Sequence, residues 1–172
     1  MKHFVVCAFR HVGKTYLADR VIRETKRNIY GFSTRVFPEL ADKFDGMAPI
    51  YIFPAGAEPV FDDDHLIGLG GGANHYTNTE VFDSLGVELL DCNDPNGLII
   101  MDEVGFLEMS AEKFQARILE CLAGDIPCLV MLKMKLQFEF IKKLSTLEGT
   151  EFIIMNEDNR DQVYESIISR LG

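Results

Sequence analysis

The octet Ala8-Phe9-Arg10-His11-Val12-Gly13-Lys14-Thr15 lies between an apolar run and an amphipathic one. Residues 3–7 are His-Phe-Val-Val-Cys, which is typical of a short buried strand, and residues 14–26 space their apolar side chains along one helical face. A small residue followed five positions later by Gly-Lys-Thr has the spacing of a phosphate-binding loop, or P-loop. The sequence therefore predicts a strand, a phosphate-binding loop and a helix in succession.

Each position of this loop has a chemical reason in a nucleotide site. Successive backbone N–H groups in a tight turn form an anion-binding nest, and the following helix adds the positive end of its dipole. Gly13 lets the backbone approach the phosphates, Lys14 reaches the β- and γ-phosphates, and the Thr15 hydroxyl coordinates Mg²⁺. Two positions depart from the usual glycines, because Ala8 adds a methyl group and His11 must accept an unusual backbone angle. All eight residues of the octet are predicted to contact the nucleotide.

Two acids follow the continuous apolar run Leu98-Ile99-Ile100-Met101. Two carboxylates at the end of a buried strand need a cationic partner, since burying unpaired charge is costly. We expect Asp102 to support Mg²⁺ beside Thr15, and Glu103 to polarise the water that attacks the γ-phosphate. An exposed acidic pair is the alternative, but its combination with a Gly-Lys-Thr loop favours a site in which Glu103 and Lys14 are catalytic.

The rest of the chain alternates strand-like and helix-like segments. Apolar runs predict strands at 29–36, 98–101, 127–132 and 151–155, and periodicity predicts helices at 79–90, 111–123, 136–146 and 160–171. This alternation predicts a three-layer α/β fold with a mostly parallel sheet, formed by residues 1–172 as one domain. Residues 39–78 are irregular, and we expect a small β-hairpin with mobile loops, including a disordered glycine cluster at 68–72 or a lid formed by it.

Composition limits the partners and the compartment. A formal net charge of −10 argues against nucleic acid, because phosphate contacts need a surplus of Lys and Arg. No apolar run is long enough to span a membrane, and no leader precedes the first strand, so we expect a cytoplasmic protein. The four cysteines show no metal-ligand spacing and are expected to be small buried hydrophobes of a reduced protein. The oligomeric state is left open.

Three short segments resemble the signatures of one protein family. Residues 102–108, Asp-Glu-Val-Gly-Phe-Leu-Glu, resemble the Asp-Glu-Ile-Gly-x-Met-Glu signature of the small P-loop nucleoside-triphosphatases of thermophiles, also known as the cancer-related nucleoside-triphosphatases. Residues 31–35, Gly-Phe-Ser-Thr-Arg, resemble the family's Gly-Phe-Tyr-Thr segment, and residues 159–161 resemble its Asn-Arg-Asp signature. The resemblance implies a RecA-like P-loop NTPase fold, a nucleotide held by residues 8–15 and the Asp102–Glu103 segment, and hydrolysis of ATP, GTP and other triphosphates with broad base tolerance.

Four further cations are possible accessory residues. Lys133 ends a strand that we expect beside the first one, where it would sense the γ-phosphate, and Lys135 is a second possibility. Arg35 either stabilises developing charge or pairs with an acid. Arg160 either closes over the base or phosphates or stays exposed while Asn159 caps the last helix.

Three functions fit these residues. The first is a nucleoside-triphosphatase that uses Mg²⁺ as cofactor and turns over slowly, because no arginine is placed firmly enough to act as a finger. The second is a nucleotide or small-metabolite kinase, whose acceptor pocket the insertion would line. The third is a nucleotide-binding regulator without hydrolysis.

Overall fold

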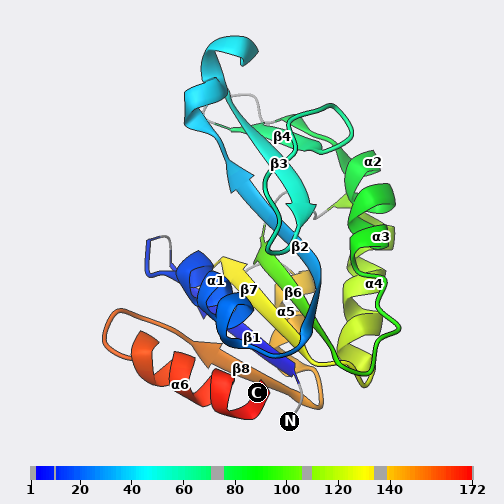
Figure 1. The fold of residues 1–172 in the computed structure, drawn as a ribbon. Helices are drawn as coiled ribbons and strands as arrows, with labels where there is room; N and C mark the ends of the chain where they lie inside the picture. The colour runs from blue at the N-terminus through cyan, green and yellow to red at the C-terminus, as the bar shows by residue number, and fades with distance from the viewer. Residues whose placement is uncertain (1–2, 10, 71–75, 106–109, 134–138, 172) are drawn as a thin grey trace.

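One twisted sheet organises the computed structural model, which describes residues 3–9, 11–70, 76–105, 110–133 and 139–171. Its eight strands have the order β5-β4-β3-β2-β6-β7-β1-β8 (Figure 1). The strands are β1 (His3–Ala8), β2 (Asn28–Val36), β3 (Ala48–Pro54), β4 (Leu66–Gly70), β5 (Tyr76–Thr77), β6 (Gly97–Val104), β7 (Cys128–Lys133) and β8 (Thr150–Ile154). From β2 to β8 along this order every neighbouring pair is parallel, whereas β3, β4 and β5 extend the sheet antiparallel.

Helices cover both faces of the parallel part of the sheet. They are α1 (Lys14–Glu24), the 3₁₀ helix η1 (Pro38–Phe44), α2 (Thr79–Val81), the π-helical turn η2 (Phe82–Gly86), α3 (Val87–Leu89), α4 (Glu112–Ala123), α5 (Glu139–Thr146) and α6 (Arg160–Leu171). Apolar side chains of α1 and α6 pack in one core cluster with Phe4 and Val6, and those of α4 and α5 pack in the other with Val5 and Cys7. Alternate residues of β1 thus serve opposite faces, which gives three layers.

The segment at 39–78 is more regular than its sequence predicts. Beyond β2 it forms η1 and three strands that join the main sheet as an arm, defined here as residues 38–70 and 76–77, at the top of Figure 1. The expected disordered loop is wrong for Gly68–Gly70, which lie in β4 and pair with β3 and β5. Backbone pairing with two neighbours overrides the weak strand preference of glycine. The rest of the cluster lies outside the described residues.

The other predicted elements are confirmed within a few residues, with one irregularity. The helix expected at 79–90 forms as α2, η2 and α3 in succession, so a π turn interrupts its regular hydrogen bonding. The helix expected from residue 136 is described from Glu139. No helix in the described ranges is both long and apolar enough to cross a bilayer.

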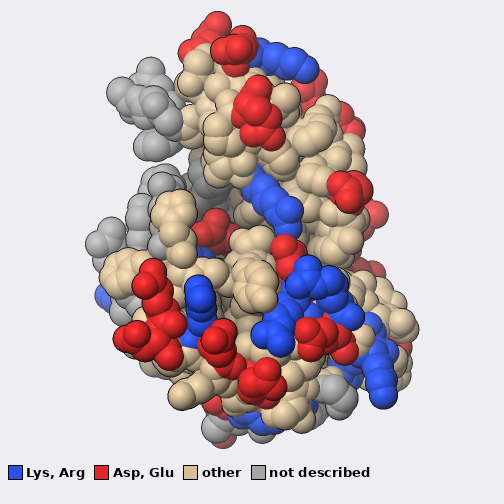
Figure 2. Space-filling view, turned by 60° about the vertical axis from the view of Figure 1, so that its left-hand side comes forward, with Lys and Arg blue, Asp and Glu red and all other residues tan. Residues whose placement is uncertain are grey.

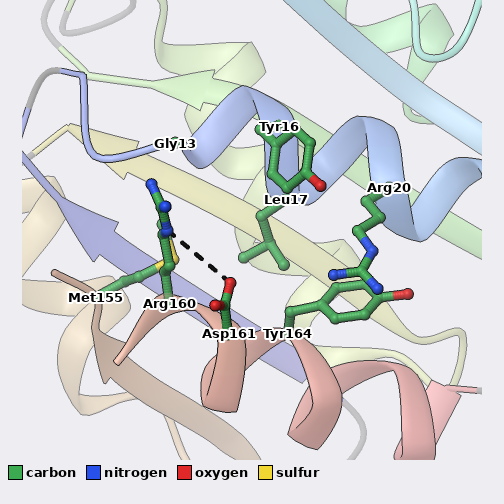
Figure 3. Close-up of a pocket in the computed structure, with 8 residues that line it drawn as sticks. All are labelled: Gly13, Tyr16, Leu17, Arg20, Met155, Arg160, Asp161 and Tyr164. Carbon is green, nitrogen blue, oxygen red and sulfur yellow. Dashed lines mark ion pairs between the residues drawn. The ribbon is translucent and has the colours of Figure 1, made fainter. Parts of the chain in front are cut away.

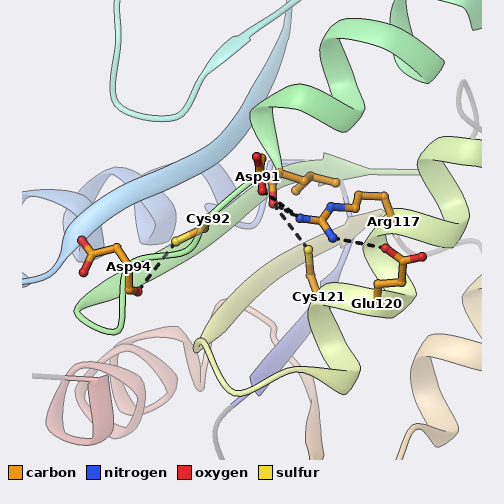
Figure 4. Close-up of polar contacts among 7 residues, drawn as sticks. Asp91, Cys92, Asp94, Arg117, Glu120 and Cys121 are labelled. Carbon is orange, nitrogen blue, oxygen red and sulfur yellow. Dashed lines mark hydrogen bonds and ion pairs between the residues drawn. The ribbon is translucent and has the colours of Figure 1, made fainter.

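The cysteines are buried and free, as expected from the sequence. Figure 4 shows Cys92 and Cys121 near the ends of α3 and α4, where Cys121 donates to the Leu90 carbonyl. Burial raises the pKa of the Cys121 thiol to about 11 and raises the pKa of Cys128 further. Thiols that stay protonated are poor nucleophiles and poor metal ligands, so these side chains act as core residues. The described residues contain no group of three potential ligands that could hold a metal ion.

Gly31 permits the closest approach between β2 and β6. It has φ +96°, and a Cβ atom at this position would lie 1.9 Å from the backbone oxygen of Ile100. The Ile100 oxygen belongs to the backbone of β6, which pairs with β2 and cannot move away. Gly31→Ala should therefore lower the free energy of unfolding by about 3 kcal/mol through overpacking and backbone strain. Chemical denaturation would measure the loss. Gly149→Ala is the control, since its φ is also positive but no atom lies within 4 Å of its added Cβ; equal losses would contradict a steric role for Gly31.

Candidate active site

The carboxyl ends of four parallel strands meet at one edge of the sheet. In register, Ala8 of β1 pairs with Lys133 of β7, and Asp102 of β6 pairs with Met131 of β7 and Ser33 of β2. A single strand, β7, therefore separates the predicted phosphate loop from the predicted acids. Open parallel sheets bind ligands at this edge, beyond the strand ends.

The loop between β1 and α1 has a left-handed backbone at two positions. His11 has φ 65° and Gly13 has φ 105°, so His11 does adopt the unusual angle that its place in the motif requires. The helix α1 begins at Lys14, directly after Gly13. Alternation of left-handed and right-handed residues turns backbone N–H groups toward one point, as in anion-binding nests. Arg10 lies outside the described residues.

Lys14 connects the loop to the acidic strand end. Its Nζ donates to the backbone oxygens of Ala8 at 3.2 Å and Phe9 at 3.0 Å, and lies 3.7 Å from Oε1 of Glu103. The Lys14 side chain is 6% exposed and that of Glu103 is 33% exposed. A pair this long, with one partner open to solvent, is weak enough for a phosphate oxygen to replace the carboxylate.

Asp102 carries a buried carboxyl group that no described side chain pairs with directly. It is 1% exposed, and neither carboxylate oxygen has a hydrogen-bond partner among the described residues. Burial, followed by the neighbouring Glu103 charge, raises the pKa of Asp102 to about 7, while Arg35 and Lys14 lower it. A buried carboxylate without a hydrogen-bond partner is costly in a protein core. A bound cation at this position would supply the missing interaction, so the group indicates a candidate cation site.

The residues present fit a magnesium ion. Mg²⁺ prefers oxygen ligands, and it is usually held by one or two protein oxygens together with phosphates and water. Asp102 offers two unused oxygens, and Thr15, in the first turn of α1, is exposed. Glu103 is fixed through its backbone, where its N–H donates to Thr34 Oγ1 at 3.4 Å, so its side chain is left to face the site.

The accessory cations separate into three different environments. Lys133 ends β7 opposite Ala8 and is partly buried, which confirms its expected place beside the first strand. Arg35, on β2, pairs with Asp19 of α1 through Nη2 and Oδ1 at 3.2 Å. Arg160 lies at the start of α6, with its Nε 3.9 Å from Asp161 Oδ1. Lys135 and Glu108 lie outside the described residues.

A pocket next to the phosphate loop was missed by the sequence analysis. It lies between α1 and α6 and is open to solvent (Figure 3). The guanidinium of Arg20 lies 3.6 Å from the centre of the Tyr164 ring on one side of it. The lining residues are Gly13, Tyr16, Leu17, Arg20, Met155, Arg160, Asp161 and Tyr164. The pocket forms where α1 and α6 come together, so no local pattern could have revealed it, although Gly13, Arg160 and Asp161 belong to motifs identified in the sequence.

The sheet, the loop after β1 and the acid-ended β6 define a P-loop NTPase of the RecA-like type. Comparison with known proteins gives the same class. The chain belongs to the family described as NTPase, whose family model matches residues 3–168.

Named relatives and solved structures agree with this family. The chain is 22% identical to the nucleoside-triphosphatase THEP1 of Aquifex aeolicus, over 93% of each chain. It is 26% identical to THEP1 of Thermotoga maritima, over 93% of this chain and 90% of the relative. The crystal structure of THEP1 from A. aeolicus matches with a TM-score of 0.77 over 98% of both chains, at 18% identity. The solution structure of a human cancer-related nucleoside triphosphatase matches with a TM-score of 0.72, at 15% identity, over 98% of this chain and 96% of that one.

Proposed function

We propose that this protein binds a nucleoside triphosphate with Mg²⁺ and hydrolyses the bond to the γ-phosphate, giving a nucleoside diphosphate and phosphate. The observation that carries the proposal is the 3.7 Å contact between Lys14 and Glu103, beside the unpartnered Asp102. Three groups meet at one edge of the sheet: the Lys14 cation for the phosphates, the buried Asp102 carboxyl group for the metal, and the partly exposed Glu103 carboxylate. Phosphoryl transfer needs this set, because positioning and charge stabilisation supply most of the catalysis.

The loop residues would hold the phosphates and Glu103 would hold the water. The backbone N–H groups of residues 8–15 and the start of α1 receive the β- and γ-phosphates, and Lys14 exchanges Glu103 for a phosphate oxygen. Released from Lys14, the Glu103 carboxylate accepts a hydrogen bond from a water molecule and orients it toward the γ-phosphorus. Thr15 and Asp102 would hold the magnesium ion. When bound, Mg²⁺ neutralises the charge that develops on the phosphate oxygens.

The pocket between α1 and α6 is proposed as the nucleoside site. It shares Gly13 with the phosphate loop, and its polar side chains are Tyr16, Arg20, Arg160, Asp161 and Tyr164. Guanidinium planes and the Tyr16 ring stack on the face of any base, whereas discrimination between bases needs hydrogen bonds to their edges. The pocket therefore supports use of both ATP and GTP with broad base tolerance. A cytoplasmic location remains a prediction from the sequence.

Replacing Lys14 by alanine tests the phosphate site. Lys14→Ala should weaken binding of Mg–ATP and Mg–GTP about 100-fold, because two charge-assisted hydrogen bonds to phosphates are lost. Titration calorimetry measures the binding, and phosphate release from ATP, GTP, CTP and UTP measures turnover. Lys142→Ala is the matched control, because Lys142 lies on α5 in an exposed pair with Glu139.

The same assay separates the competing functions. A triphosphatase releases phosphate without an acceptor, whereas a kinase forms product only when an acceptor hydroxyl is added. A regulator binds nucleotide tightly and releases no phosphate. Unchanged nucleotide binding in Lys14→Ala would exclude the proposed site in every case.

A further inference from the structure

The Arg35–Asp19 ion pair lies at the edge of the proposed site, outside the set of groups that the reaction above uses. Arg35 follows Ser33 by two residues on β2, and Ser33 pairs in register with Asp102. Asp19 follows Thr15 by one helical turn on α1, so the two side chains share one helix face. The pair therefore connects β2, the strand next to Asp102, with α1, the helix that follows the phosphate loop. Figure 2 shows basic and acidic side chains together along the hollow below the arm.

The pair satisfies the guanidinium only in part. Asp19 is its single hydrogen-bond partner among the described residues, and Nε of Arg35 is buried without a partner. Both side chains remain about 40% exposed, at 40% for Arg35 and 39% for Asp19. Half-exposed pairs with one hydrogen bond contribute little to folding and exchange easily. A guanidinium with unused N–H donors binds a phosphate dianion more strongly than one carboxylate oxygen, because it can donate two parallel hydrogen bonds.

The two ends of the pair flank the proposed magnesium ligands. Arg35 lies two residues beyond Ser33, the register partner of Asp102, and Asp19 lies one helical turn beyond Thr15. This placement puts Arg35 on the side of the site where the outermost phosphate of a bound triphosphate would lie. The Phe53 ring, 5.8 Å from the guanidinium carbon, restricts Arg35 from the β3 side.

We propose that Arg35 is the residue that distinguishes a triphosphate from a diphosphate, held by Asp19 in the free protein and passed to the γ-phosphate when the triphosphate binds. This inference rests on the proposed function and adds an arginine supplied by the chain itself. Asp19 acts as a holding residue that competes with the γ-phosphate. When the γ-phosphate leaves, Arg35 returns to Asp19, which weakens the hold on the diphosphate product.

The test compares a non-hydrolysable ATP analogue with ADP, both with Mg²⁺, by titration calorimetry. Arg35→Ala should weaken binding of the analogue about 10-fold and change the affinity for ADP by no more than about 2-fold. It should also lower kcat about 100-fold, which is less than the roughly 10³- to 10⁵-fold contribution of an arginine finger. Arg35→Lys should restore part of the analogue affinity, because it restores charge without the fork. Asp19→Asn should raise the affinity for the analogue about 3-fold, and this gain in affinity should be absent in the double variant with Arg35→Ala.

Arg117→Ala is the matched control. Arg117 pairs with Asp91 at 3.3 Å, is 29% exposed, and lies on α4 (Figure 4), which packs in the core cluster opposite that of α1. The Arg117→Ala variant should bind the analogue and ADP with wild-type affinity. If Arg35→Ala weakened binding of the analogue and of ADP equally and lowered the melting temperature, Arg35 would have a structural role and the proposal would be overturned.

The same data separate this proposal from the proposed function. A wild type that binds both ligands but releases no phosphate would remove the triphosphatase function, while the analogue-to-ADP ratio still decides the role of Arg35. A wild type that binds neither ligand would overturn both.

Discussion

Glu103→Gln should bind Mg–NTP about as well as the wild type and hydrolyse it about 100- to 1,000-fold more slowly. The amide keeps the size of the side chain but accepts hydrogen bonds far less strongly than a carboxylate, so the attacking water is no longer oriented. Binding should stay, or improve slightly, because Lys14 loses the 3.7 Å contact that competes with the phosphates. The expected signature is therefore a fall in kcat with a nearly constant dissociation constant.

Single-turnover phosphate release, with saturating enzyme, measures this effect on the chemical step itself. Glu120→Gln is the control, because Glu120 is an exposed acid on α4 that pairs with Arg117. A Glu103→Gln variant that keeps full turnover would show that another group orients the water. Loss of binding in that variant would instead assign Glu103 to the metal or the phosphates.

The sequence was sufficient for the parts of the molecule that depend on local patterns. Apolar runs located β1, β6 and β7, and parallel pairing then required the end of β6 and the loop after β1 to share one edge. The Lys14–Glu103 contact follows from that arrangement, since one intervening strand leaves the two side chains within reach. Motif spacing and fold topology thus lead to the same site.

Features that depend on distant segments were beyond local patterns. Gly68 and Gly70 are residues typical of loops, yet both pair with β3, and Gly68 also pairs with β5. The pocket joins α1 to α6, which are more than 130 residues apart. The partner of Arg35 was also not identified, although the four-residue spacing of Thr15 and Asp19 would have placed Asp19 on the face of α1 that carries a predicted metal ligand.

Asp102 makes the stability of the ligand-free protein depend on pH in an unusual direction. Burial raises its pKa from an ordinary 3.8 to about 7, so the folded state binds a proton that the unfolded state releases. The associated stabilisation is complete below about pH 4 and is lost progressively as pH rises to about 7. The loss amounts to about 4 kcal/mol in total, of which roughly 2–3 kcal/mol falls between pH 5 and pH 8.

Asp102→Asn should escape this loss, because an amide does not ionise. Between pH 5 and pH 8 the unfolding free energy of the variant should rise by roughly 2–3 kcal/mol relative to that of the wild type. For a chain of this size this corresponds to a relative shift of several degrees in melting temperature. Asp158→Asn, at an exposed loop position, should show the same difference from wild type at both pH values. Mg–NTP should reverse the order at pH 8, since the ion offsets the buried charge and stabilises only the wild type through Asp102. A difference that does not change with pH would mean that Asp102 ionises without cost, and the buried carboxylate would then no longer support a cation site.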